Sequence, residues 1–139
     1  MRVFIDTSSL VKRYIKESGS EELNHVFDVS SEIFVSPITK IEFHSAIERR
    51  LVDKSLSKEE FQTVLREFKL DYLNFEIVKF DAMLELLAIE MIRKHRLRTL
   101  DSIQLTSAKI KEVDRFITSD EMLYKIAKVE LDYECVFIS

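Results

Sequence analysis

The chain opens with VFIDTSSLV at residues 3–11, in which a short apolar run leads directly into an aspartate. The uninterrupted apolar residues 3–5 are typical of a strand that is buried on both faces of a parallel sheet. Asp6 and the hydroxyl residues after it form a natural helix start, and apolar side chains then recur at helical spacing over residues 10–15. The segment therefore predicts a buried strand that passes directly into a helix.

Further apolar runs repeat this pattern along the chain, with helical segments between them. They lie at residues 33–35, 76–80, 115–118 and 135–138. Residues 81–95 are apolar on much of their circumference, which predicts a helix that is covered on two sides. Strands that alternate with helices imply a parallel sheet with helices on both faces. We therefore expect an α/β fold in three layers, with a central parallel five-stranded sheet flanked by helices.

The composition indicates one globular domain spanning residues 1–139. Hydrophobic residues make up 46% of the chain and charged residues 33%, which is typical of soluble proteins and not of disordered ones. No apolar run approaches the length of a membrane span, and the single cysteine, Cys135, cannot form an internal disulfide. From these features we expect a cytoplasmic protein.

The residues of greatest chemical interest are four acids that lie where loops run into helices, namely Asp6, Glu42, Asp101 and Asp120. Asp6 follows the first predicted strand and Asp120 the fourth, at the sheet edge where α/β proteins bind ligands. Hard cations such as Mg²⁺ take oxygen ligands, and carboxylates from distant segments can hold them for phosphodiester hydrolysis. We therefore expect one acidic, metal-binding pocket, with hydroxyl groups of Ser8 and Thr118 in support.

Each of these acids also has a purely structural interpretation. Asp6 could simply cap the first helix, and Thr39-x-x-Glu42 matches the pattern of a capping box. Asp101 and Asp120 lie at helix starts, where a carboxylate interacts favourably with the helix dipole. Ordinary capping is also the simpler role for Ser102 and Ser119. The metal-site interpretation depends on all four acids meeting in one place.

Four motifs in register resemble the PIN domain, and within it the VapC-type toxins of toxin–antitoxin (VapBC) pairs. The motifs are FIDTSSLVK at 4–12, IEFHSAIER at 41–49, LRTLDSIQL at 97–105 and FITSDEML at 116–123. Asp6, Glu42, Asp101 and Asp120 match the family's acidic quartet, and Ser8 and Thr118 match its supporting hydroxyl positions. Ser102 and Gln104 fall at variable positions, and the glycine expected before the last strand is missing.

The resemblance implies a three-layer PIN-like fold and a metal-dependent endoribonuclease that uses Mg²⁺ or Mn²⁺. The acidic quartet would be both catalytic and metal-binding. The resemblance further implies RNA as substrate, a cognate antitoxin as protein partner, and a homodimer. A housekeeping RNA-processing nuclease and a catalytically silent interaction module of the same fold remain the alternatives.

Basic residues offer a tentative RNA-binding surface, although the net charge of −4 argues mildly against a nucleic-acid binder. Lys12, Arg13, Arg96 and Arg98 could hold RNA phosphates, with a solvated helix face as the alternative interpretation. The apolar sides of residues 10–15, 23–27 and 61–72 could form a groove for an antitoxin helix, or could simply pack in the core.

Two other functional classes deserve comparison. Metal-independent cleavage would need histidines as acid and base, and the candidates are His25, His44 and His95, which no sequence pattern brings together. A phosphoacceptor receiver domain would need an adjacent acidic pair after the first strand, whereas this chain has Asp6-Thr7. Neither pattern fits the chain as well as the acidic quartet does.

Overall fold

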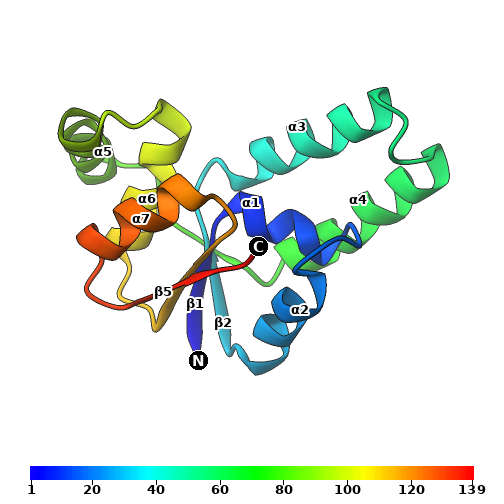
Figure 1. The fold of residues 1–139 in the computed structure, drawn as a ribbon, viewed down its shortest axis with the longest axis horizontal. Coiled ribbons are helices and arrows are strands. Elements are labelled where there is room, and N and C mark those ends of the chain that lie inside the picture. The colour runs from blue at the N-terminus through cyan, green and yellow to red at the C-terminus, as the bar shows by residue number, and fades with distance from the viewer.

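The computed structural model describes residues 1–139 and arranges them as a central sheet between two layers of helices (Figure 1). The sheet has five parallel strands in the order β3-β2-β1-β4-β5. The strands are β1 (Arg2–Ile5), β2 (Glu32–Val35), β3 (Glu76–Ile77), β4 (Arg115–Thr118) and β5 (Glu134–Phe137). The expected α/β fold with a parallel five-stranded sheet is confirmed.

Helices connect successive strands and cover both faces of the sheet. They are α1 (Thr7–Leu10), the 3₁₀ turn η1 (Val11–Arg13), α2 (Ser20–Val29), α3 (Thr39–Val52), α4 (Lys58–Tyr72), α5 (Ala82–His95), α6 (Thr99–Ile110) and α7 (Glu121–Glu130). One buried cluster packs helices α1, α2, α3 and α4 against one face of the sheet. A second packs helices α5, α6 and α7 against the other face. In Figure 1, α3 and α4 extend together to one side of the sheet, and α5 lies on the opposite side.

The two faces of β1 show how sequence alternation builds the two cores. Val3 and Ile5 belong to the cluster under α1 to α4, whereas Phe4 belongs to the cluster under α5 to α7. Successive side chains of a strand point to opposite faces, so one short apolar run supplies both cores. This arrangement holds β1 at the centre of the sheet, and it fixes the position of the residue that follows the strand, Asp6.

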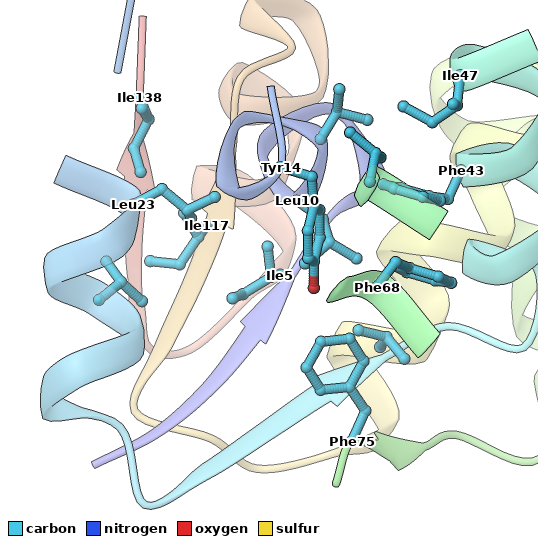
Figure 2. Packing of buried hydrophobic residues seen from close by; sticks show 14 of the residues in the cluster. Ile5, Leu10, Tyr14, Leu23, Phe43, Ile47, Phe68, Phe75, Ile117 and Ile138 are labelled. Atoms are coloured by element: carbon cyan, nitrogen blue, oxygen red, sulfur yellow. The ribbon is translucent and has the colours of Figure 1, made fainter. Parts of the chain in front are cut away.

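A cluster of aromatic side chains packs helices α3 and α4 against the segment that follows α1 (Figure 2). The rings of Phe43 and Phe68 stack with their centroids 3.9 Å apart, and Tyr14 meets both edge-on. Residues 10–15, 23–27 and 61–72 therefore place most of their apolar side chains in this core. Core packing, the simpler interpretation of these three segments, accounts for their apolar patterns.

Three details differ from the sequence-based expectations. The third strand covers only Glu76–Ile77 and not residues 76–80, because it is a solvent-exposed edge strand and the chain soon turns into α5, which Asp81 caps. The prediction that residues 81–95 are covered on two sides is wrong: Met83 and Leu86 are 62% and 67% exposed. The last strand forms without a preceding glycine.

The order of the strands creates a switch point between β1 and β4. The chain runs outward from β1 through β2 to β3, then returns to the other side of β1 to form β4 and β5. In such sheets the loops at the carboxyl ends of the two central strands diverge and leave a crevice for ligands. Among the helices around this sheet, none combines the length and apolar character needed to cross a membrane.

Candidate active site

A pocket of about 480 Å³ lies at the carboxyl edge of the sheet, at the switch point between β1 and β4. All four predicted acids line it, and they arrive from four separate segments of the chain. The complete lining consists of Asp6, Thr7, Ser8, Val11, Ile38, Ile41, Glu42, Ser45, Ala46, Arg49, Leu100, Asp101 and Asp120. The fold thus brings together carboxylates that are up to 114 positions apart in sequence (120 − 6).

Asp6 occupies the N-cap position of α1, but its side chain makes no capping hydrogen bond. Its Oδ2 accepts hydrogen bonds from the hydroxyls of Ser8 (2.5 Å) and Thr118 (2.8 Å). Burial raises the pKa of Asp6 to about 6, although the two hydroxyl donors oppose the rise; Glu42 and Asp120 add to it. The structure therefore places Ser8 and Thr118 against Asp6, where the sequence predicted supporting hydroxyls.

Glu42 lies in the first turn of α3, yet it does not form a capping box with Thr39. The N-cap residue is Ile38, and Thr39 interacts with the backbone amide and hydroxyl of Ser36. The capping interpretation of Glu42 is therefore wrong. Its Oε1 instead accepts hydrogen bonds from Thr7 (2.9 Å) and Gln104 (2.6 Å). Burial raises the pKa of Glu42, and Asp101 contributes to the rise.

Asp101 and Asp120 complete the group. Asp101 lies in the first turn of α6, and its pKa is raised by partial burial and by the negative charge of Asp120. Asp120 is the N-cap of α7, and its Oδ1 accepts a 3.0 Å hydrogen bond from the backbone amide of Leu123. Oδ1 of Asp120 therefore caps the helix, whereas Oδ2 accepts no hydrogen bond from the protein.

The four carboxylates share one feature that bears on cation binding. Each keeps at least one oxygen free of protein hydrogen bonds: Oδ1 of Asp6, Oε2 of Glu42, both oxygens of Asp101 and Oδ2 of Asp120. No three acidic, histidine or cysteine side chains are close enough to act together as direct ligands of one ion. These donors fit Mg²⁺, which retains several waters and takes only one or two carboxylates.

The predicted RNA-binding lysine and arginine after α1 lie outside the pocket and have intramolecular partners. Lys12 contacts Glu17 (3.5 Å) and the carbonyl of Ser18 (2.8 Å). Arg13 hydrogen-bonds Asn24 (3.0 Å) and packs over the ring of Phe27. The Arg13 contacts tie η1 to α2, and the Lys12 contacts tie η1 to the segment before α2, so both cations have structural roles.

The other basic candidates surround the start of α6. Arg96 and Arg98 are exposed, and the positive charge of Arg98 acts to lower the pKa of Asp101. The three histidines lie on separate helices, and none lines the pocket. His95 packs with the helices on one face of the sheet and contacts Glu130 at 2.9 Å, whereas His25 and His44 belong to α2 and α3 on the other face.

Two residues at the pocket were missed by the sequence analysis. Gln104 is 1% exposed and donates to Glu42, although its position in the sequence motif is a variable one. A polar side chain inside the otherwise apolar run Ile103–Leu105 was the available signal. Arg49 lines the pocket on the same helix as Glu42, seven residues later, and that helical spacing was its signal.

The fold and the pocket together define the class of protein: an α/β protein with an acidic site at the switch point of its parallel sheet. The PIN domain family matches residues 3–129 by sequence, so the chain belongs to the PIN domain family. No curated protein matches the chain by sequence.

Several solved structures share the fold. A chain of VapBC2 from Rickettsia felis, bound to a DNA fragment from the VapBC2 promoter, is 18% identical with a TM-score of 0.68, over 100% of both chains. PAE2754 from Pyrobaculum aerophilum is 13% identical with a TM-score of 0.69, over 96% of this chain and 87% of the other. A toxin–antitoxin complex from Klebsiella pneumoniae is 14% identical, with a TM-score of 0.63 over 85% and 86% of the two chains.

Proposed function

We propose that this protein is a metal-dependent endoribonuclease that hydrolyses RNA phosphodiester bonds with Mg²⁺ or Mn²⁺. Asp6, Glu42, Asp101 and Asp120 are the proposed catalytic and metal-binding residues. The observation that carries the proposal is the convergence of these acids on one pocket, each with an oxygen that no protein donor occupies. PIN domains are generally nucleases, and membership of this family supports phosphodiester hydrolysis as the reaction.

In this reaction the protein positions the carboxylates, and the ion activates the attacking water. When bound, Mg²⁺ or Mn²⁺ would supply an activated water and would stabilise the charge that develops on the phosphate oxygens. Ser8 and Thr118 donate to Oδ2 of Asp6 and leave Oδ1 without a protein donor. Thr7 and Gln104 do the same for Glu42 through Oε1. No protein nucleophile is required, because water is the attacking group.

We further propose that the protein is the toxin of a type II toxin–antitoxin pair, with a cognate antitoxin as partner and a cytoplasmic location. The likeness to chains of VapBC2 and of the Klebsiella pneumoniae toxin–antitoxin complex supports this assignment. Coexpression with candidate antitoxins tests it: a partner that copurifies and suppresses cleavage is the expected result. Cleavage that no antitoxin suppresses would favour a housekeeping nuclease.

A homodimer is also proposed, and the exposed face of α5 supports it. Met83, Leu86 and Ile89 recur every three residues on this helix and are 62%, 67% and 49% exposed. An apolar stripe of this kind is more typical of a protein–protein contact than of a solvated helix. Light scattering of the wild type and of Leu86→Glu tests the proposal: the wild type should be a dimer and the variant a monomer.

The test of the nuclease itself is cleavage of a mixed, structured RNA pool. The wild type should cut the pool with Mg²⁺ or Mn²⁺ and stop when a chelator removes the ion. Asp6→Asn should be inactive, and Asp28→Asn is a matched control because Asp28 is an exposed acid of α2, away from the pocket. Cleavage that survives both chelator and Asp6→Asn would contradict the metal mechanism. A protein that binds the ion but leaves all RNA intact would favour a silent interaction module.

A further inference from the structure

The acidic pocket continues along α3 beyond its carboxylates. Glu42, Ser45 and Arg49 are spaced by three and four residues, so they lie on the same side of the helix, and all three line the pocket. A second cavity, lined by Ser45, Glu48, Arg49, Val52 and Asp53, shares two of its residues with the first. Ser45 and Arg49 therefore line both cavities, and the second cavity lies beside the acidic pocket on the side of α3 toward its end.

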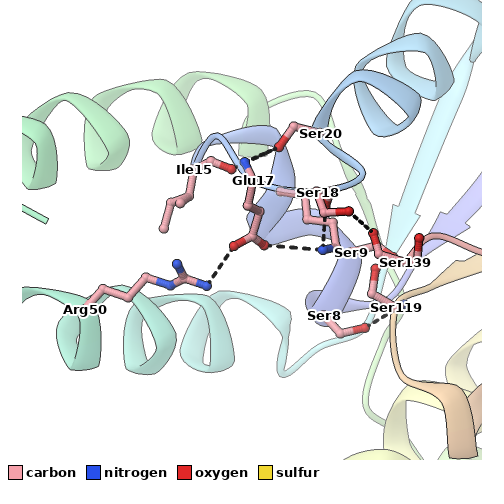
Figure 3. A network of polar contacts seen from close by, with 10 residues as sticks. Ser8, Ser9, Ile15, Glu17, Ser18, Ser20, Arg50, Ser119 and Ser139 are labelled. Atoms are coloured by element: carbon pink, nitrogen blue, oxygen red, sulfur yellow. Dashed lines mark hydrogen bonds and ion pairs between the residues drawn. The ribbon is translucent and has the colours of Figure 1, made fainter. Parts of the chain in front are cut away.

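Arg49 is the only cationic side chain that lines the acidic pocket. It is exposed, forms no ion pair, and donates one hydrogen bond of 3.3 Å to Ser45. The next residue provides a contrast, because Arg50 pairs with Glu17 at 3.2 Å and so joins α3 to the segment before α2 (Figure 3). Only one of these adjacent arginines is therefore left free for an external anion.

The chemistry of the free arginine fits a backbone phosphate. A guanidinium presents several donors in a rigid fork and binds phosphate oxygens in pairs. Seven residues of α-helix separate the Cα atoms of Glu42 and Arg49 by about 10 Å. That separation places Arg49 away from the bond that the acids would hydrolyse, at a phosphate farther along the strand.

We propose that Arg49 binds a backbone phosphate of the RNA that flanks the cleaved bond, and that the strand leaves the acids along this side of α3. The inference rests on the proposed nuclease function. Arg49 takes the place of Lys12 and Arg13 as the proposed phosphate contact, because both of those cations already have protein partners. The interaction is independent of base identity, because phosphate contacts position a strand without reading its sequence.

The test compares two arginines in similar settings. Arg66 of α4 is exposed, lies outside both cavities and donates a 3.3 Å hydrogen bond to Thr63, much as Arg49 does to Ser45. Arg49→Gln and Arg66→Gln are each made in an Asp101→Asn background, which silences cleavage. Binding of a fluorescent single-stranded RNA is then measured over a range of salt concentrations.

Arg49→Gln should weaken RNA binding about tenfold. It should also make the negative slope of log affinity against log salt shallower by roughly 0.7, the value for one phosphate contact on a single strand. Arg66→Gln should bind like its parent. The thermal midpoint and Mn²⁺ affinity of Arg49→Gln should equal those of the parent, which separates lost contact from lost folding.

Equal affinity and equal salt slope for the two variants would overturn the role of Arg49 while leaving the nuclease proposal intact. In active protein, Arg49→Gln should raise KM and leave kcat nearly unchanged. If the Asp101→Asn parent binds no RNA and the wild type cuts none, the proposed function itself fails, and the inference about Arg49 fails with it.

Discussion

Gln104 of α6 donates a 2.6 Å hydrogen bond to Glu42 of α3, at the same oxygen that accepts from Thr7 of α1. Its amide nitrogen also contacts the hydroxyl of Thr7 at 2.9 Å, so three helices meet around one carboxylate. The amide oxygen of Gln104 is buried and has no partner, so this side chain serves the pocket as a donor. The result is that Glu42 is held with its Oε2 free.

The first prediction concerns this support. Gln104→Leu removes the donor and should lower Mn²⁺ affinity about 10- to 100-fold, because groups that orient a metal ligand contribute that much. The thermal midpoint without metal should not fall by more than a few degrees, since a buried amide with an unpaired oxygen is replaced by hydrocarbon. Isothermal titration and thermal unfolding measure the two quantities; an unchanged Mn²⁺ affinity would exclude the positioning role.

The second prediction is the pH dependence of ion binding. Because the pKa of Asp6 is raised to about 6, its carboxylate gains a proton as the pH falls through that value and then competes with the cation. Mn²⁺ affinity should therefore be nearly constant above pH 7 and fall about tenfold between pH 7 and pH 5. Asp28→Asn should show the same profile as the wild type. An affinity that stays flat down to pH 5 would contradict the role of Asp6 as a ligand.

The third prediction follows from the same raised pKa and concerns stability. An acid whose pKa is higher in the folded than in the unfolded state costs stability once the pH exceeds its unfolded pKa, and the cost is complete above the folded pKa. Asp6 should therefore destabilise the metal-free protein increasingly between about pH 4 and pH 6. Asp6→Asn should raise the free energy of unfolding at pH 7.5 by about 2 kcal/mol. Urea unfolding without metal measures this, and a less stable variant would contradict it.

The fourth prediction concerns Glu130, which joins α7 to α5 and α6. Its carboxylate contacts His95 (2.9 Å), Lys94 (2.9 Å) and Lys109 (3.1 Å), and its side chain is 4% exposed. These donors, led by His95, lower the pKa of Glu130 to about 2. An acid with a lowered pKa stabilises the fold above its unfolded pKa, near 4.5, and loses that contribution as the pH falls toward 2.

Glu130→Gln should therefore lower the free energy of unfolding by about 2–3 kcal/mol at pH 7, and by much less at pH 3. Urea unfolding at the two pH values measures the difference. Glu121→Gln serves as control, because Glu121 forms an exposed pair with Lys125 at 3.5 Å that contributes little. Equal effects of the two substitutions at pH 7 would contradict this account of the cluster.

The fold was predictable because its strands are short, continuous apolar runs separated by helical periodicity. The meeting of the acids was predictable for Asp6 and Asp120, since each closely follows a central strand and parallel strands end at one edge. The support of Glu42 by Gln104 was not predictable, because it depends on how α3 and α6 approach each other. The pairing of Lys12 with Glu17 was not predictable either, because Glu17 lies beyond a turn.

We propose above that the pocket binds a divalent cation, with one or two of the four carboxylates as direct ligands and the others acting through water on the ion, and Mn²⁺ binding tests this most directly. The measurement is a calorimetric titration of the wild type, Asp6→Asn, Glu42→Gln, Asp101→Asn and Asp120→Asn, with Glu121→Gln as the control acid adjacent to Asp120. We predict a loss of at least tenfold in affinity for each pocket variant and none for the control. Wild-type affinity in all four pocket variants would contradict the claim.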